Sequence, residues 1–96
     1  MSTFDVAHFQ EQGQQIIVVF VNNQIGHQPS IDQNKMLKLL QRCASTAGLA
    51  GTAVAVWDAG GGRMGFLAPP SWHPFFNSIS LQDLALNINK KLTCGD

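Results

Sequence analysis

The chain is poor in charge, has no tyrosine and carries only two cysteines among its 96 residues. Charged residues make up 12% of the sequence, against roughly 25% in an average soluble domain. Uncharged amides supply the missing polarity, with nine glutamines and six asparagines but a single glutamate, Glu11. Disorder is not expected, because 45% of the residues are hydrophobic and the composition of disordered chains is absent. We therefore expect one folded domain over residues 1–96.

The absence of net charge and of long apolar runs excludes several classes of partner. Six Lys and Arg residues balance six Asp and Glu residues, so no net field attracts nucleic acid or anionic lipid. The longest apolar run, residues 16–21, is too short to span a bilayer. The N-terminal residues lack the basic and apolar regions of a signal peptide. These features predict a cytoplasmic protein with no nucleic-acid and no membrane partner.

The two cysteines are too few for a disulfide scaffold and are not spaced as a CxxC motif. In a cytoplasmic setting we expect both to be reduced thiols, Cys43 as a small hydrophobe in a helix and Cys94 packed near the chain end. The three histidines, His8, His27 and His73, lie far apart and form no close pair of ligands. No metal site and no cofactor are expected.

The periodicity of apolar residues predicts strands over the first ten residues and over residues 16–21, 52–58 and 63–68. An unstructured leader is the alternative for the first ten. Helices are predicted to begin at Ser30 and at about Ile79, the second ending at Leu92. The order (β)βαββα predicts a single α+β domain, with a mainly antiparallel sheet of three or four strands and two helices packed on one face.

The run at residues 16–21 is apolar on both alternating faces, so it needs cover on both sides: helices on one, and helices, a second sheet or a second subunit on the other. Ser30 and Gln33 fit a capping box. Trp57 is expected to pair across the following turn with Met64 or Phe66. The expected central core is Val18, Phe20, Val54, Val56, Leu37, Leu40, Leu84 and Ile88.

Catalytic patterns are weak. The chain has no GxSxG elbow, and the glycine run at residues 60–62 leads into a strand, which indicates a hairpin tip rather than a phosphate loop. Asp58 lies at a strand end beside this turn and has the best claim of the carboxylates on a site, although aspartate is ordinary before a turn. A small enzyme that uses His73 with Asp58 or a cysteine is therefore the alternative hypothesis.

Residues 66–76 hold three prolines and four aromatic residues between a strand and a helix, whereas loops are normally polar. In one interpretation Trp72, Phe75 and Phe76 fold inward and plug an open end of the sheet. In the other, residues 69–76 form a rigid apolar surface that contacts a protein partner, a second copy or a small apolar ligand.

The favoured hypothesis is a non-enzymatic interaction or ligand-binding module that acts as a homo-oligomer, a homodimer above all, through an apolar surface. The near-neutral charge provides little repulsion between copies, which favours self-association. No residue is assigned a catalytic role. The residues expected to bind are Trp72, His73, Phe75, Phe76 and Asp58.

Overall fold

The computed structural model describes residues 2–94 and forms one five-stranded sheet in the order β4-β3-β2-β1-β5. The strands are β1 (Ser2–Glu11), β2 (Gln14–Phe20), β3 (Thr52–Gly60), β4 (Arg63–Leu67) and β5 (Lys90–Cys94). The helices are α1 (Ser30–Thr46), α2 (His73–Ser78) and α3 (Leu81–Ala85), with short 3-10 helices η1 (Asn23–His27) and η2 (Pro70–Trp72). The α+β class is confirmed, with one strand more than the upper expectation.

The sheet is mixed rather than uniformly antiparallel. β2 and β3 run parallel, because α1 carries the chain back to the starting end of the sheet between them. The other three pairings, β1 with β2, β1 with β5 and β3 with β4, are antiparallel. The predicted first strand is confirmed from Ser2 onward, and Met1 lies outside the described residues. Its hairpin to β2 turns at Gln12 and Gly13, both with positive φ, as a tight two-residue turn requires.

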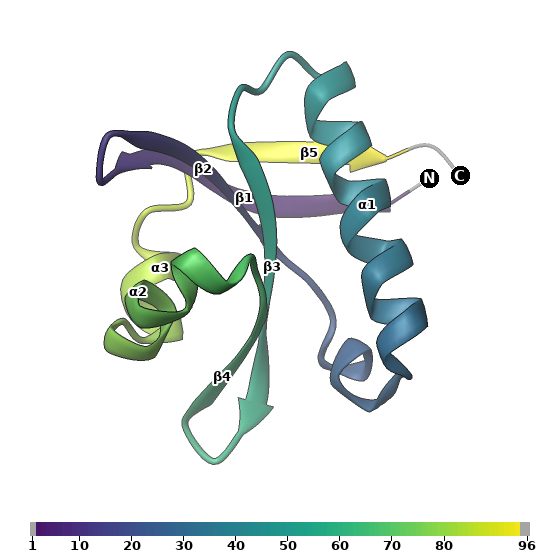
Figure 1. The fold of residues 1–96 in the computed structure, drawn as a ribbon, viewed down its shortest axis with the longest axis vertical. Helices are drawn as coiled ribbons and strands as arrows, with labels where there is room; N and C mark the ends of the chain where they lie inside the picture. The colour runs from purple at the N-terminus through teal and green to yellow at the C-terminus, as the bar shows by residue number, and fades with distance from the viewer. Residues whose placement is uncertain (1, 95–96) are drawn as a thin grey trace.

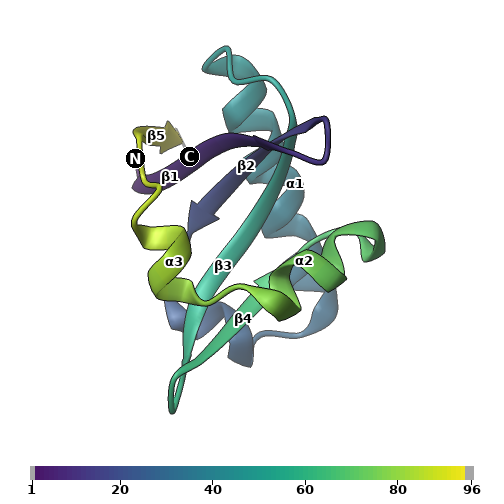
Figure 2. The same ribbon diagram turned by 90° about the vertical axis from the view of Figure 1, so that its left-hand side faces the viewer.

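Helices cover both faces of the sheet, which corrects the prediction of two helices on one face. In Figure 1, α1 lies on one side of β3, and α2 and α3 lie on the other; Figure 2 shows the second side toward the viewer. Ile17 and Val19 of β2 pack with Leu40 of α1, whereas Ile16 and Val18 pack with the α2–α3 side. A strand that is apolar on both faces needs apolar cover on both, and here helices provide it.

The predicted helix over residues 79–92 is wrong in its second half. α3 ends at Ala85, and the chain then forms β5 against β1. Leu92 and Cys94 point into the core while Lys91 and Thr93 are exposed, which is strand alternation. The open edge of β1 favours this pairing, and Ile88 is consequently exposed rather than part of the core.

The rest of the predicted core is largely confirmed. Val18, Val54, Val56, Leu40 and Leu84 are fully buried, and Phe20 and Leu37 are partly buried. The predicted capping box is wrong: Pro29 occupies the N-cap of α1, and no side chain caps that end. The Gln33 side chain instead donates a hydrogen bond to the carbonyl of Ile25, 2.9 Å away.

Cys43 and Cys94 form a disulfide, which overturns the expectation of two reduced thiols. Their Cα atoms are 5.6 Å apart, although 51 residues separate them along the chain. The expectation rested on the cysteine count, the spacing and the expected cytoplasmic setting, none of which reports an approach created by the fold. The bond ties α1 to β5 at one edge of the sheet. Within residues 2–94, no helix has the length and apolar character needed to cross a membrane.

Candidate functional site

Two rings of the aromatic segment that follows β4, Trp72 and Phe76, belong to the core. Trp72 and Phe76 retain only 4% and 2% of their exposed area and pack on Ala7, Val18 and Val54 of the sheet. With Leu84, Ile79 and Leu81 they form the apolar cover of this face of the sheet. A contact surface made of these two rings therefore has no support in their position.

The remaining members of the segment are more accessible. Phe75 is partly buried and makes tilted or edge contacts with Phe9, Trp72 and Phe76, at centroid distances of 6.2, 5.9 and 5.1 Å. His73 is exposed; its Nε2 lies 2.9 Å from the carbonyl oxygen of Ala68. These contacts fix the path of the chain between β4 and α2.

Asp58 and His73 are not brought together as a catalytic pair. An Asp58 carboxylate oxygen accepts a hydrogen bond of 2.8 Å from the Gly60 N–H, the local turn role that aspartate often takes. Among the described residues, no hydrogen bond or ion pair joins Asp58 to His73. Residues 2–94 also contain no cluster of three metal-ligating side chains.

A groove lies between β4 and the segment that joins α2 to α3. It has a volume of about 500 Å³ and is lined by Gly62, Arg63, Met64, Phe66, Phe76, Asn77, Ser78, Ile79, Ser80 and Leu81. A smaller hollow of about 270 Å³ continues it toward the hairpin tip, where Asp58 and Gln82 join the lining. We call these together the β4 groove. Its floor is apolar, because the Phe66 ring stacks on Phe76 with centroids 5.3 Å apart.

The main chain of β4 has one side open, and one hydrogen bond identifies the groups that face outward. The Val21 N–H donates to the Val56 carbonyl, so the main-chain groups of Val56 face β2. The flanking residues Ala55 and Trp57 must then direct theirs to β4, where they pair with Leu67 and Gly65. It follows that the N–H and C=O groups of Met64 and Phe66 point away from the sheet, at its open edge.

Gln41 supports this assignment independently. Ala53 lies on β3 beyond the end of β4, and the same alternation directs its N–H to the β4 side. That N–H donates to the Gln41 side-chain oxygen over 2.8 Å, and the Gln41 amide nitrogen donates to the Gly51 carbonyl over 3.2 Å. A side chain therefore completes this edge at Ala53. Met64 and Phe66 have no such side-chain partner among the described residues.

Trp57 lines a second cleft, of about 360 Å³, on the α1 face. Its indole fits between two glycines: a Cβ at Gly26 would lie 2.8 Å from the indole nitrogen, and a Cβ at Gly65 would overlap the ring. Trp57 thus faces Gly65 across the hairpin, not Met64 or Phe66 as predicted. The ring is 8% exposed, so it is a structural filler rather than an open platform for a ligand.

Comparison of the chain with protein-family models, with curated proteins and with solved structures finds no match. The geometry of the β4 edge therefore carries the functional argument. Sequence reasoning identified β4 and the aromatic segment but not the open main chain of Met64 and Phe66. One signal was present in the sequence: residues 64–68 carry no charge, and Pro69 and Pro70 follow them directly.

Proposed function

We propose that this protein is a non-enzymatic interaction module whose β4 edge binds an extended polypeptide segment by strand addition. One observation carries the proposal: the main-chain groups of Met64 and Phe66 point outward, and their side chains line the β4 groove. An added strand would take its main-chain hydrogen bonds from these two residues and place alternate side chains in the groove.

The chemistry of the groove favours binding over catalysis. Arg63 is the only ionisable residue in the lining of its larger part, and the other side chains are apolar, amide or hydroxyl. General acid–base catalysis needs a positioned proton donor or acceptor, which the lining of this larger part does not offer. The smaller part contributes Asp58, whose carboxylate accepts the hydrogen bond from the Gly60 N–H. An enzyme built on His73 and Asp58 stays the alternative hypothesis, without a hydrogen bond between the two to support it.

The predicted homo-oligomer is compatible with this edge, because strand addition places a partner on Met64 and Phe66, whose side chains are apolar and uncharged. A small apolar ligand in the β4 groove is the competing form of the binding hypothesis. A role in nucleic-acid binding is still not expected for a chain of zero net charge. The cytoplasmic location also stays a prediction, and the Cys43–Cys94 disulfide favours an oxidising setting instead.

Amide hydrogen exchange in the presence of a synthetic peptide with the β4 sequence, residues 62–68, tests strand addition. The Met64 and Phe66 amides should become protected when the peptide binds, because each gains a hydrogen-bond acceptor. The Lys91 and Thr93 amides on the opposite edge serve as internal controls and should not change. The experiment is run at a dilution at which the chain is monomeric, so that a second copy does not already protect these amides. Unchanged exchange at Met64 and Phe66 under that condition, for this peptide and for a library of extended apolar peptides, would exclude the proposal.

A further inference from the structure

We infer that the segment added to the β4 edge is β4 of a second copy, antiparallel and related by a two-fold axis at Gly65, so that two sheets join into one. The inference rests on the proposed function, since it names the partner of the same edge. The support is the self-complementarity of β4 in hydrogen bonding, in shape and in charge.

Hydrogen bonding selects the register. An axis at Gly65 places Met64 opposite Phe66 of the second copy, and Phe66 opposite its Met64. Both are residues with outward main-chain groups, so each pair exchanges two N–H···O bonds, about four bonds in all. An axis at Met64 would instead place Phe66 opposite Gly62 of the second copy, at the hairpin tip. An axis at Phe66 would place Met64 opposite Ala68 of the second copy, beside Pro69. Only the Gly65 register joins the two outward residues of each strand to each other.

Shape agrees with this register on the α1 face. Gly65 would meet Gly65 of the second copy in a non-hydrogen-bonded pair, where Cα atoms approach to about 4.5 Å. The space above each glycine is already filled by a Trp57 indole, with which a Cβ at Gly65 would clash. The two indoles would therefore flank the axis and cover the new hydrogen bonds from water on that face.

The opposite face and the charges also agree. Met64 would contact Phe66 of the second copy beside the β4 groove, a sulfur–aromatic contact of the favourable kind. Arg63 is the only charged residue of β4 and would lie opposite Leu67. The two Arg63 residues would be four positions apart along the strands, roughly 13 Å, so they would not repel each other strongly. The neutral chain adds no net repulsion between copies.

The other edge of the sheet offers no equivalent partner surface. The main-chain N–H and C=O of His8 face the β5 side, and by alternation those of Phe4 do too. Phe4 pairs with Leu92, so the main-chain groups of Leu92 face β1. The main-chain groups of Lys91 and Thr93 therefore point outward. Lysine at an edge is a common means of preventing strand addition. Among the described strands, this leaves β4 as the edge on which two copies would pair.

Light scattering coupled to size exclusion measures the assembly of the full chain. We expect a species of twice the 10.4 kDa chain mass that dissociates on dilution. Met64→Pro removes an outward donor without breaking a bond to β3 and should raise the dimer dissociation constant by about tenfold or more. Thr93→Pro, the matched change on the β5 edge, should leave the dimer intact. Met64→Lys, which keeps the N–H but adds a charge at the seam, gives a second test should Met64→Pro not fold.

The register is tested by an isotope-filtered NMR experiment on a mixture of labelled and unlabelled chains. We expect contacts between the Met64 methyl group of one copy and the Phe66 ring of the other. A chain that stays monomeric at millimolar concentration while binding the β4 peptide would overturn the inference and leave the proposed function standing. A dimer that survives both Met64 variants, or whose contacts lie elsewhere, would overturn it as well. At a dilution at which the chain is monomeric, failure of the peptide to protect Met64 and Phe66 would reject both.

Discussion

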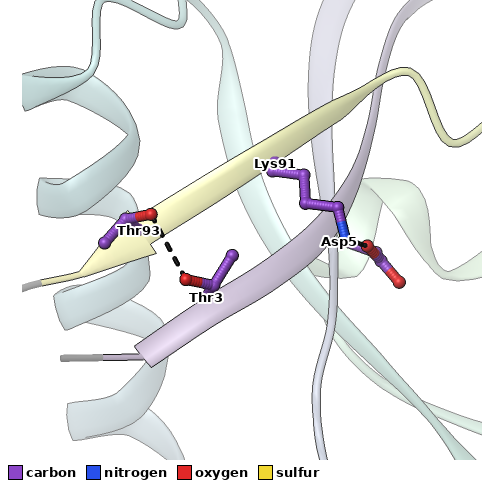
Figure 3. Close-up of polar contacts among 4 residues, drawn as sticks. All are labelled: Thr3, Asp5, Lys91 and Thr93. Atoms are coloured by element: carbon purple, nitrogen blue, oxygen red, sulfur yellow. Dashed lines mark hydrogen bonds and ion pairs between the residues drawn. The ribbon is translucent and has the colours of Figure 1, made fainter.

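The two edges of the sheet differ in how their main-chain groups and side chains are used. At the β5 edge, Lys91 pairs with Asp5 over 3.0 Å, and the hydroxyl groups of Thr3 and Thr93 lie 3.3 Å apart (Figure 3). A disulfide from Cys94 to α1 ties this edge strand to the body of the domain. At the β4 edge, the outward positions are apolar and no covalent link holds the strand. The β5 edge thus carries an ion pair and a cross-link, whereas within residues 2–94 the β4 edge has neither.

Two amide side chains take the place of missing strand residues. Each bonds main-chain groups that lie beyond the end of an edge strand. The Asn89 side chain accepts from the His8 N–H at 3.0 Å and donates to the His8 carbonyl at 2.8 Å, as a paired strand residue would. Gln41 does the same for Gly51 and Ala53 on the other side of the sheet. Both edges are therefore completed near their ends. The outward groups of β4 lie between these completed ends, and the proposed partner strand would pair with them.

The largest loss of stability is expected on removing the Cys43–Cys94 disulfide, which links the β5 edge to α1. Replacing both Cys43 and Cys94 by alanine should lower the free energy of unfolding by about 4 kcal/mol, because the bond closes a loop with a sequence separation of 51 residues. Urea unfolding measures the change. Reductant should destabilise the original chain to a similar extent and leave the double variant unaffected. A loss below about 1 kcal/mol would mean that β5 stays in place without the bond.

Core truncation on either face should cost a comparable amount. Leu40 packs α1 against the sheet on the face of the disulfide, and Leu84 packs α3 against the opposite face, beside the β4 groove. Both side chains are fully buried. Leu40→Ala and Leu84→Ala should each lower the free energy of unfolding by about 2–5 kcal/mol in thermal or urea unfolding. Only Leu84→Ala should also weaken binding at the β4 edge. Equal weakening by both variants would contradict the separation of the two faces.

The next largest loss of stability is expected on removing the side-chain amides of Asn89 and Gln41. Asn89→Ala and Gln41→Ala each leave a main-chain N–H and a carbonyl without their side-chain partner, which should cost about 1–3 kcal/mol. Hydrogen exchange should quicken at the His8 amide in the first variant and at the Ala53 amide in the second. Gln10→Ala, at an exposed glutamine of β1, is the matched control and should have little effect. Equal exchange in all three variants would show that the amides do not act as strand substitutes.

The smallest effect is expected from the ion pair on the β5 edge. The side chains of Lys91 and Asp5 are 73% and 47% exposed, so water and salt screen their attraction. Lys91→Ala should lower the free energy of unfolding by about 0.5 kcal/mol or less, and added salt should reduce the difference further. The same variant should increase association through β5 if lysine protects that edge. Unfolding at two salt concentrations and light scattering check the two expectations.

Local patterns predicted the fold where they had a single interpretation. Residues 16–21, apolar on both faces, required two covered sides, and the Gly60–Gly62 run required a hairpin tip. The C-terminal segment had two interpretations, because Leu81 and Leu84 fit a helix while Leu92 and Cys94 alternate as a strand. Competition with the open edge of β1 selected the strand, and no local signal reports that edge.

The sequence predicted only part of the candidate site. The aromatic segment was recognised, and both of its interpretations were open; burial of Trp72 and Phe76 now favours the core. The importance of Met64 and Phe66 was missed, because their side chains alone look like ordinary apolar strand residues. Their outward main-chain groups follow from the register with β3, which depends on residues from three separate segments.

The sequence by itself determined the α+β class, the strands around residues 16–21 and 52–58, the helix from Ser30 and the hairpin turn at residues 60–62. These features depend on side-chain periodicity and on the φ angles available to each residue, which are local properties. Only the tertiary structure decided the strand order, the second helical face, the Cys43–Cys94 pairing and the open edge at β4. A main-chain group is paired or free according to which strand lies beside it, and that neighbour is chosen by the packing of the whole chain.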